Sequence, residues 1–350
     1  MAPLPYLRTG GMPQHVEHIG CASATAPASP MRALVTGAAG FVGSHLVGHL
    51  GACGDDVTCT DRADGGPDLL DATGIRRLIE EVRPDVVYHL AGQADVGGSW
   101  DSPVQTLRVN AEGTLNLLEA VRTLGGARVV TVSSADVYGV VDPGDLPTRE
   151  SAPLRPVSPY AASKAAADLL ALQAHLGHGL DVVRARSFNH LGPGQSDRFV
   201  CSALASRIAA VELAGGDSIR VGNLDARRDF TDVRDVVRAY RCLAVDGRPG
   251  AAYNVCTGAT VSVREVAERL VEIAGRGPTG SGPTGSGPAG PIRLVDDPAL
   301  RRPVDVAVSC GDPTAIRTDT GWQPELSMDR TLADLLEFWR GRHRSDPAAD

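Results

Sequence analysis

Lysine is almost absent from this chain. Lysine and arginine together number 34, yet Lys164 is the only lysine, so arginine supplies every other permanent cation. The net charge of −8 argues against nucleic acid or an anionic membrane surface as a partner, because both bind basic faces. The sequence also lacks any apolar run near the roughly 18 residues that a membrane span needs. We therefore expect neither partner.

Cysteine is sparse and irregularly spaced. The seven cysteines are odd in number, scattered along the chain and never spaced C-x-x-C. This pattern argues against a disulfide framework and against a zinc site, and it suits reduced thiols. We therefore expect a cytoplasmic protein with no metal site.

Two segments lack the apolar residues that a folded core requires. Residues 1–30 are rich in Ala, Pro and Gly and contain no continuous apolar core, so a secretory signal is not expected. We expect a disordered extension there and a fold that begins at Met31. Residues 275–291 contain a near-repeat of GPTGS and are predicted to form a flexible surface insertion.

The remaining sequence alternates strand and helix patterns. Short β-branched runs bounded by turn residues predict buried strands at 32–37, 56–61, 85–92 and 128–134. Helical spacing between them predicts helices that include 41–50, 74–82 and 110–125. Buried strands that alternate with helices predict an α/β fold, with a doubly wound parallel sheet of Rossmann type and a smaller C-terminal α/β lobe that binds the substrate.

A glycine-rich turn joins the first predicted strand to the first predicted helix. TGAAGFVG places Gly37, Gly40 and Gly43 in a G-x-x-G-x-x-G pattern. Glycines there allow a tight turn and let backbone N–H groups approach a pyrophosphate at the helix N-terminus. The triplet is a weak signal alone in a glycine-rich chain, and its place between a strand and a helix strengthens it.

Charged residues after the second strand bear on the choice of dinucleotide. Asp61 ends that strand, where a carboxylate can accept hydrogen bonds from the adenosine ribose, and this favours NAD over NADP. Arg62 could instead accept the 2′-phosphate of NADP, so NADP stays open. Asp68 is either an adenine contact or a solvated loop carboxylate.

The one lysine follows a tyrosine by four residues, so Tyr160 and Lys164 share one helix face. A phenol pKa of about 10 is too high for a base at neutral pH, and a nearby ammonium is expected to lower it toward the working range. Arginine has a wider planar fork and would not place a compact charge there. Ser134, at the end of the strand 128–134, is the candidate hydroxyl that holds the substrate oxygen, with a buried structural serine as the alternative.

TGxxGxxG, SSADVYG (133–139) and Y-x-x-x-K together resemble the extended short-chain dehydrogenase/reductase family that acts on nucleotide sugars. The resemblance runs from Met31 to about residue 340, apart from the Gly/Pro segment. It is closest to the GDP-mannose branch. Five further stretches are similar to GDP-4-keto-6-deoxymannose reductases: RSFNHLGPGQS (186–196), GNLDARRDFTDVRDVVRAY (222–240), YNVCTG (253–258), LRRPVDV (300–306) and TGWQPE (320–325).

The resemblance implies a division into two domains and a homodimer. It assigns 31–188 and 232–257 to an NAD(P)-binding Rossmann domain, and 189–231 and 258–340 to a nucleotide-sugar-binding lobe. Helices around 105–124 and 158–177 would pack across a dyad into a four-helix bundle, as in the family's dimers. The alternative is that these helix faces only cover the sheet.

The resemblance also implies roles for individual residues. Ser134, Tyr160 and Lys164 match the family's catalytic triad. The cofactor would contact the glycine turn and the charged residues named above, Tyr160 and Lys164, together with Phe41, Val42, Leu69, Leu90, Ala91, Gln93, Asn110, Ser133 and Phe188. A nucleotide-diphosphate sugar, expected to be GDP-linked, would contact Ser134, Asn189, Asn223, Arg228 and Arg302, with the two arginines clamping phosphate in bidentate fashion.

Three reactions share this scaffold, and the residues after Ser134 bear on the choice. In a reductase, NAD(P)H delivers hydride to a C4 ketone and Tyr160 donates the proton; a 4-epimerase uses bound NAD⁺ without net redox change; a 4,6-dehydratase needs a further acid/base pair. Family dehydratases carry a glutamate two residues after the hydroxyl, where this chain has the shorter Asp136, and Ala135 cannot transfer a proton. Reductases tend to carry two acidic residues around this point, and Val137 departs from that pattern, so it is the similarity along the whole chain that favours reduction of a GDP-4-keto-6-deoxyhexose. Epimerase, dehydratase and a non-catalytic nucleotide sensor are the alternatives.

Overall fold

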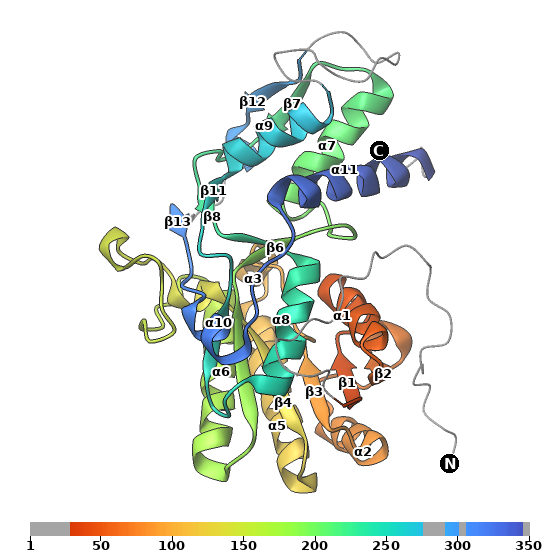
Figure 1. The fold of residues 1–350 in the computed structure, drawn as a ribbon, viewed down its shortest axis with the longest axis vertical. Coiled ribbons are helices and arrows are strands. Elements are labelled where there is room, and N and C mark those ends of the chain that lie inside the picture. Colours follow the sequence, from red (N-terminus) through yellow and green to blue (C-terminus); the bar gives the residue numbers. More distant parts are fainter. Residues whose placement is uncertain (1–28, 276–290, 301–305, 346–350) are drawn as a thin grey trace.

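The computed structural model describes residues 29–275, 291–300 and 306–345 (Figure 1). Most of the predicted N-terminal extension (1–30), nearly all of the predicted Gly/Pro insertion (275–291) and Arg302 lie outside these described residues. The described residues form two lobes, a large one built on a parallel sheet and a smaller one above it in Figure 1.

The large lobe is built on a six-stranded sheet in the order β10-β5-β4-β3-β1-β2. All neighbouring strands are parallel, and their β-branched apolar runs are buried because helices cover both faces. The strands are β1 (Arg32–Thr36), β2 (Asp56–Thr60), β3 (Val86–His89), β4 (Arg128–Ser134), β5 (Val182–Ser187) and β10 (Ala252–Val255). The strand order reverses between β1 and β3, which opens the crevice where such sheets bind their ligands. The predicted fold class is confirmed.

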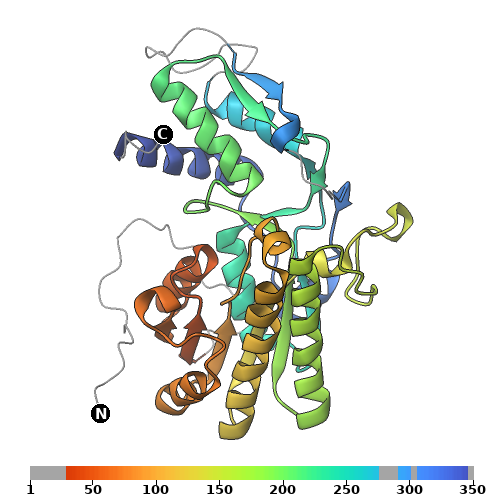
Figure 2. The same cartoon turned by 180° about the vertical axis from the view of Figure 1, so that it is seen from behind.

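Helices form a layer on each face of this sheet. One layer consists of α1 (Phe41–Ala52), α8 (Val233–Asp246) and α10 (Thr314–Thr320), and the other of α2 (Ala72–Val82), α5 (Gly113–Leu124) and α6 (Pro159–His178). Alternate strand residues feed the two cores: in β1, Ala33 and Val35 face the first layer and Leu34 the second. Figure 2 shows the second layer from behind, with α5 and α6 side by side.

Local sequence signals set where the helix of the predicted Tyr–Lys pair begins and ends. Ser158 caps α6 by accepting a hydrogen bond from the Ala161 N–H, and Pro159 occupies the first turn. Gly179 ends the helix in the left-handed conformation. Tyr160 and Lys164 are therefore fixed in the first two turns of a long helix.

The helix predicted over 110–125 is interrupted. The chain forms α4 (Pro103–Leu107), then a π turn over Arg108–Glu112, and only then α5. The predicted strand 85–92 is also shorter in the structure, because the chain leaves the sheet after His89. Further short elements are α3 (Gly98–Asp101) and 3₁₀ turns at Arg62–Asp64, Ala135–Tyr138, Pro143–Asp145 and Pro298–Leu300.

The small lobe has its own apolar core. Helices α7 (Val200–Ala214), α9 (Val263–Ile273) and α11 (Met328–Ser345) pack together with the two-stranded sheet of β7 (Ser218–Val221) and β12 (Arg293–Asp296). The lobes are joined by β6 (Asn189–Leu191), which pairs with β9 (Phe230–Asp232), and by β8 (Arg227–Arg228), which lies between β11 (Val261–Ser262) and β13 (Val308–Ser309). Among the described helices, none is long and apolar enough to cross a bilayer.

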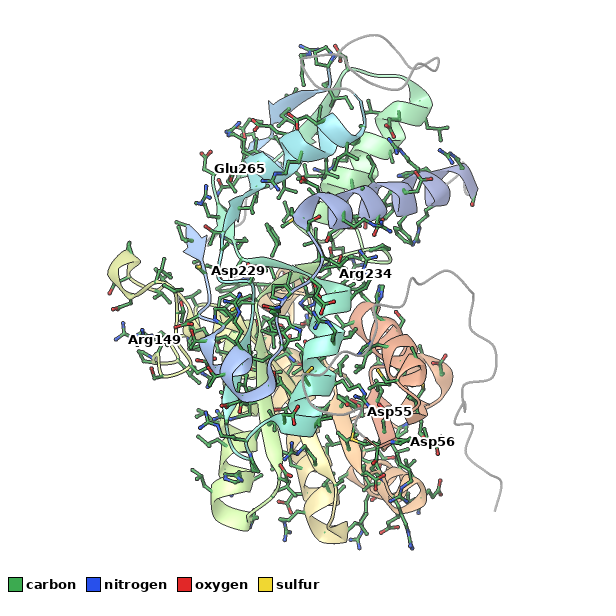
Figure 3. The ribbon with its side chains drawn as sticks, viewed as in Figure 1. Asp55, Asp56, Arg149, Asp229, Arg234 and Glu265 are labelled. Atoms are coloured by element: carbon green, nitrogen blue, oxygen red, sulfur yellow. The ribbon has the colours of Figure 1, made fainter. Side chains whose placement is uncertain are left out.

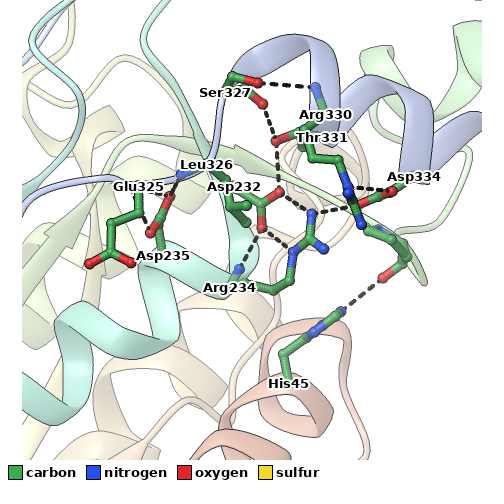
Figure 4. Close-up of polar contacts among 11 residues, drawn as sticks. His45, Asp232, Arg234, Asp235, Glu325, Leu326, Ser327, Arg330, Thr331 and Asp334 are labelled. Atoms are coloured by element: carbon green, nitrogen blue, oxygen red, sulfur yellow. Dashed lines mark hydrogen bonds and ion pairs between the residues drawn. The ribbon is translucent and has the colours of Figure 1, made fainter. Parts of the chain in front are cut away.

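A buried polar network fixes α11 of the small lobe against α8 of the large lobe (Figure 4). The Asp232 carboxylate caps α8 and accepts hydrogen bonds from Arg234 Nη2 at 2.8 Å and from Thr331 Oγ1 at 2.7 Å. Arg234 Nη2 also lies 2.8 Å from the carboxylate of Asp334. Asp229 and Arg234 both lie at this junction in Figure 3.

The domain division predicted from the sequence remains a prediction. Helix α10 lies inside the range predicted for the small lobe, but it packs on the core of the large lobe.

Candidate active site

The glycine turn between β1 and α1 leaves no room for larger residues. Gly37 has a φ of +73°, and a Cβ there would come within 2.7 Å of the Ala91 nitrogen. A Cβ on Gly43 would come within 2.1 Å of the Gly37 carbonyl oxygen. Gly40 is the N-cap of helix α1 and offers no side-chain cap, and the first turn has no acidic residue, so the N–H groups and dipole of the helix can face an anion.

The two residues after Gly40 point in different directions. Val42 packs against the core of the large lobe. The Phe41 ring lies edge-on to His45 at 5.5 Å and stacks on His190 of β6 at 6.2 Å. Phe41 therefore connects the glycine turn to the strand that leads into the small lobe.

Asp61 ties the end of β2 to the glycine turn. One carboxylate oxygen accepts the Ala63 N–H at 3.0 Å, and the other accepts the Ala39 N–H at 3.3 Å. Arg62 Nη1 lies 3.6 Å from the carboxylate of Asp68, and both side chains are largely exposed. Asp61 and Arg62, predicted to choose the dinucleotide, therefore lie near Asp68, the predicted adenine contact, at the edge of the crevice.

The leucines and alanine predicted beside the cofactor mainly serve the framework. Leu69 is buried in the core between α2 and α5, and its carbonyl accepts a hydrogen bond from Asn116. Leu90 packs on the opposite core, and the Ala91 N–H donates to Thr36 Oγ1 at 3.2 Å. The Leu69 side chain thus points into the protein rather than into the crevice.

Asn110, in the π turn, holds the loop that follows β3. Its Oδ1 accepts the Gln93 N–H at 2.8 Å, and its Nδ2 donates to the Gln93 carbonyl at 3.0 Å and to Ser163 Oγ at 2.8 Å. Ser163 in turn donates to the Tyr160 carbonyl at 2.7 Å. Asn110 therefore links the predicted cofactor loop to the tyrosine helix instead of presenting its amide to the crevice.

His89, at the end of β3, is a buried residue of this region that the sequence analysis missed. Its Nδ1 lies 2.9 Å from Thr36 Oγ1, and its Nε2 lies 3.0 Å from Thr114 Oγ1. Thr114 donates its proton to the Asn110 carbonyl, so it must accept from a protonated Nε2. Burial, aided by the charge of Lys164, lowers the pKa of His89 to about 3. A histidine among the buried strand residues VVYH was the sequence signal for it.

The predicted triad comes together at the end of β4. Tyr160 is 9% exposed, and the Ser134 side chain lies beside its phenol, where it acts to lower the phenol pKa. Lys164 Nζ donates to the Val132 carbonyl at 2.9 Å. Burial lowers the pKa of Lys164 to about 8. Serine, tyrosine and lysine therefore converge from β4 and α6, as their spacing in the sequence suggested.

The predicted direction of the phenol pKa is wrong for this structure. The pKa of Tyr160 is raised, first by burial and then by the negative charge of Asp136, and the hydrogen bond with Ser134 only partly opposes this. Lys164 directs its ammonium to a backbone carbonyl. The buried tyrosine is therefore held in the protonated form, which suits a proton donor.

The segment after Ser134 forms a short 3₁₀ turn, Ala135–Tyr138. The Asp136 N–H donates to Ser134 Oγ at 3.2 Å, and the Asp136 side chain is exposed. Ala135 and Phe188 are buried in one small apolar cluster. Phe188 therefore supports the turn from below.

The residues predicted to bind substrate line the junction and the small lobe. Asn189 is exposed on β6 and pairs in register with Phe230, two residues after Arg228. Arg228 Nη1 donates to the Arg227 carbonyl at 2.9 Å. Asn223 lines a cavity of about 340 Å³ together with Val221, Gly222, Leu224, Asp225, Arg264, Leu294 and Asp296. Arg302 lies outside the described residues.

Two buried polar atoms of the crevice fit a bound dinucleotide. Among the described residues, Gln93 Oε1 and Ser133 Oγ are buried and have no hydrogen-bond partner. Both residues belong to the set predicted to contact the cofactor. Together with the glycine turn, which a Cβ would fill, they fit a dinucleotide that supplies or accepts a hydride when bound.

Comparison with known proteins agrees with this geometry. The model of the GDP-mannose 4,6 dehydratase family matches residues 65–335. The chain belongs to the GDP-mannose 4,6-dehydratase family. This family lies within the extended short-chain dehydrogenases/reductases, and this protein is an NAD(P)-dependent enzyme of that type.

Proteins that are similar to this chain carry out different reactions. The chain is 38% identical to GDP-6-deoxy-D-mannose reductase of Pseudomonas aeruginosa over 317 residues, which cover 90% of this chain and 99% of that protein. It is 31% identical to GDP-mannose 4,6-dehydratase of Yersinia enterocolitica over 287 residues, which cover 77% of this chain and 76% of that one.

Solved structures give the same picture. RMD from Pseudomonas aeruginosa, complexed with NADPH, matches with a TM-score of 0.78 and 37% identity over 89% of this chain and 98% of that chain. UDP-glucose 4-epimerase from Thermus thermophilus, complexed with NAD, matches with a TM-score of 0.76 and 32% identity over 88% and 99%. Both nicotinamide dinucleotides thus occur in this member's structural relatives.

Proposed function

We propose that this protein reduces the C4 ketone of a GDP-linked 4-keto-6-deoxyhexose with NAD(P)H, and that Tyr160 donates the proton. The observation that carries the proposal is the buried phenol of Tyr160, which burial and Asp136 keep protonated beside Ser134. A phenol that retains its proton can deliver it to the oxygen of a ketone as hydride arrives at the carbon.

The chain's own residues divide the work of this reaction. Ser134 would hold the C4 oxygen by a hydrogen bond, and Tyr160 would transfer its proton to that oxygen. The proton donor requires only its resting form, whereas an oxidation of C4 would first require the phenolate. Tyr160 therefore holds the proton that the reductive direction needs without a prior ionisation.

Similarity over nearly the whole chain supports the same reaction. The relative named GDP-6-deoxy-D-mannose reductase is matched over 99% of its length at 38% identity. The relative named GDP-mannose 4,6-dehydratase is matched over 76% of its length at 31% identity. The fuller match to the reductase supports a GDP-linked 4-keto sugar as substrate.

The junction between the lobes supplies groups for the nucleotide. We assign the diphosphate to Asn189 and Arg228 of this junction, and to Arg302 on the resemblance to the family alone, and we assign the nucleoside to the cavity lined by Asn223. A cavity of about 340 Å³ is within the range that suits a nucleoside-sized group. The two arginines offer charge-assisted, bidentate hydrogen bonds to phosphate.

A 4-epimerase is the second candidate. A UDP-glucose 4-epimerase of Mycolicibacterium smegmatis is 33% identical over 333 residues, covering 89% of this chain and 99% of that protein. A dehydratase is supported less, because Ala135 has no group that could transfer a proton and Asp136 is shorter than glutamate. The epimerase would interconvert two sugars with no net consumption of cofactor.

We also propose that this protein forms homodimers and that it works in a reducing cytoplasm. The outer faces of α4, α5 and α6 expose apolar side chains that a second copy could cover: Val104, Leu107, Leu115, Leu169 and Leu176. None of the six cysteines in the described part of the chain forms a disulfide, which suits a reducing compartment.

Product analysis with pure protein tests the proposed reaction. The enzyme is incubated with the GDP-linked 4-keto-6-deoxymannose and NADPH or NADH, and in parallel with GDP-mannose alone, and products are identified by NMR. We expect cofactor oxidation and a 4-hydroxy product only with the ketone. Interconversion of two sugars without cofactor consumption would instead establish the epimerase, and release of a 4-keto product from GDP-mannose the dehydratase. Tyr160→Phe should lower kcat by about 100-fold or more, whereas a nucleotide sensor would keep its binding function.

A further inference from the structure

A buried charge cluster lies directly behind the predicted catalytic residues. Asp168 follows Tyr160 and Lys164 on α6 at intervals of four residues, so the three side chains share the helix face that covers the sheet. The Asp168 side chain is 0% exposed. Tyr160 and Lys164 belong to the predicted catalytic triad, whereas Asp168 takes no part in the proton transfer.

Strand β5 gives Asp168 two buried partners. Arg184 and Arg186 alternate with Val183 and Ala185 along the strand, so both arginines face α6 while the apolar pair faces the opposite core. Arg186 Nε and Nη2 donate to the two oxygens of Asp168 at 2.9 and 2.8 Å, and Arg184 Nη1 donates at 2.6 Å. Burial opposes ionisation of Asp168, but these hydrogen bonds prevail and lower its pKa.

Arg186 also contacts the turn that follows Ser134. Arg186 Nη1 donates to the Tyr138 hydroxyl at 3.0 Å, and its guanidinium lies 5.2 Å from the centre of the Tyr138 ring. In the sheet, Arg186 pairs in register with Ser133, next to Ser134. One guanidinium therefore contacts both the helix that carries Tyr160 and the turn that carries Asp136.

The cluster continues to a second strand and is fully hydrogen-bonded at that end. Tyr138 donates its proton to Asn254 Oδ1 at 2.7 Å, and Asn254 Nδ2 donates to the Thr148 carbonyl at 2.8 Å. Arg186 also donates to the Glu150 carbonyl at 2.9 Å. Since burial raises the pKa of Tyr138 to about 12, this hydroxyl remains a neutral link in the network.

We infer that Asp168, Arg186 and Tyr138 are positioning residues that set the Tyr160 phenol against Ser134. Ser134 and Tyr160 come from separate elements, β4 and α6, and a proton transfer between substrate and phenol needs these elements in one fixed register. The buried ion pair fixes α6 on β5, and the Arg186–Tyr138 contact fixes the turn after β4 on the same guanidinium. The inference rests on the proposed function for its kinetic readout only.

A matched control exists elsewhere in the large lobe. Asp55 and Arg241 form an ion pair at 2.8 Å, with side chains 0% and 5% exposed, close to the burial of Asp168 and Arg186. Asp55 precedes β2, at the end of the sheet opposite to Asp61, and Figure 3 shows it well below the junction. Asp55→Asn leaves one buried arginine, Arg241, without its carboxylate, and Asp168→Asn leaves two, but only the Asp168 cluster lies behind the site.

The test compares Tyr138→Phe, Asp168→Asn and Asp55→Asn in the full chain, with kcat, KM, Tm and amide hydrogen exchange. We expect kcat to fall about tenfold in Tyr138→Phe and further in Asp168→Asn, with KM within about twofold, because misplacement weakens the chemical step more than binding. Asp55→Asn uncouples one buried arginine rather than two, so it should lower the Tm by a smaller amount than Asp168→Asn and keep kcat within about twofold of the wild type. Unchanged kcat in both site-side variants, measured well below every Tm, would overturn the inference.

Hydrogen exchange separates this inference from the proposed function. Exchange in 133–138 and 160–164 should rise in Tyr138→Phe and in Asp168→Asn but stay at the wild-type level in Asp55→Asn. This readout needs no substrate, so a wild type that fails to reduce the ketone would refute the proposed function alone. If Asp168→Asn does not fold, Tyr138→Phe decides by itself, and unchanged exchange in 133–138 counts against the inference.

Discussion

The Lys164 ammonium donates a hydrogen bond to the Val132 carbonyl oxygen at 2.9 Å, and burial has lowered the pKa of this lysine to about 8. The contact fixes α6 on the strand that ends in Ser134, and it holds a compact cation beneath the crevice. It also explains why the single lysine of the chain stands where arginine serves everywhere else, since a wider guanidinium would not fit the same place.

Lys164→Arg should therefore impair catalysis although it conserves charge. We expect kcat to fall by about 100-fold or more, since the planar fork displaces Tyr160 or the cofactor from the proton-transfer geometry. Steady-state kinetics with the 4-keto sugar give this value. An arginine variant with wild-type kcat would show that charge alone suffices at this position.

The lowered pKa of Lys164 also predicts that the free energy of unfolding rises as the solution becomes alkaline. Its pKa is about 8 in the folded chain against 10.5 for the ordinary side chain, so the unfolded chain binds more protons between these values. The free energy of unfolding of the cofactor-free protein should therefore carry a contribution that rises with pH from about 8 to about 10.5. Lys164→Met should lack this contribution in urea unfolding measured across that range, and an equal slope in both proteins would contradict the assignment.

The lowered pKa of His89 predicts that the protein loses stability at acid pH. Its pKa is about 3 when folded, against 6.5 for an ordinary histidine, so the unfolded chain binds more protons as the pH falls below 6.5. The free energy of unfolding should fall on acidification by about 1 kcal/mol per pH unit from this residue. His89→Gln should be less sensitive to acid between pH 6.5 and about pH 4, whereas His178→Gln, at an exposed position, should follow the wild type.

Asp136 predicts a shift of the activity profile. Its negative charge raises the pKa of Tyr160, second only to burial, so Asp136→Asn should lower that pKa. A proton donor loses activity as it ionises, and the alkaline decline of kcat should therefore begin at a lower pH in the variant. A pH–rate series for both proteins measures this, and a decline that moves to higher pH would exclude Tyr160 as the donor under control of Asp136.

Asp61 and Arg62 predict a change in the choice of dinucleotide. A 2′-phosphate would lie near the Asp61 carboxylate, which holds the Ala39 N–H, and like charges repel there. Asp61→Asn should raise kcat/KM for NADPH relative to NADH by about tenfold. Arg62→Ala should lower kcat/KM for NADPH and leave NADH nearly unchanged, and no change in the ratio in either variant would place the 2′-position elsewhere.

The features of the fold that could be predicted from the sequence are those set by local patterns of residues. The strand 128–134 and the spacing of Tyr160 from Lys164 follow from side-chain alternation and from the helical repeat, and both features appear in the structure. The π turn at Asn110 does not follow from such a pattern, because side-chain bonds to Gln93 and Ser163 from two other segments stabilise it.

The electrostatics of the site were beyond reach for the same reason. The sequence showed a lysine near a tyrosine, but only the fold shows that the ammonium bonds the Val132 carbonyl and that burial and Asp136 raise the phenol pKa. Likewise, Asp168 and Arg186 are ordinary charged residues until α6 and β5 bring them together. Burial of charge depends on long-range packing, which no local pattern encodes.

The most direct test of the account is the turnover of Tyr160→Phe with the GDP-linked 4-keto-6-deoxymannose and reduced cofactor, alongside the Kd for that cofactor. We predict that kcat falls by about 100- to 10,000-fold while the cofactor Kd changes little, because the variant lacks only the hydroxyl that donates the proton. A variant that reduces the ketone at nearly the wild-type rate would contradict the assignment of Tyr160 as the proton donor.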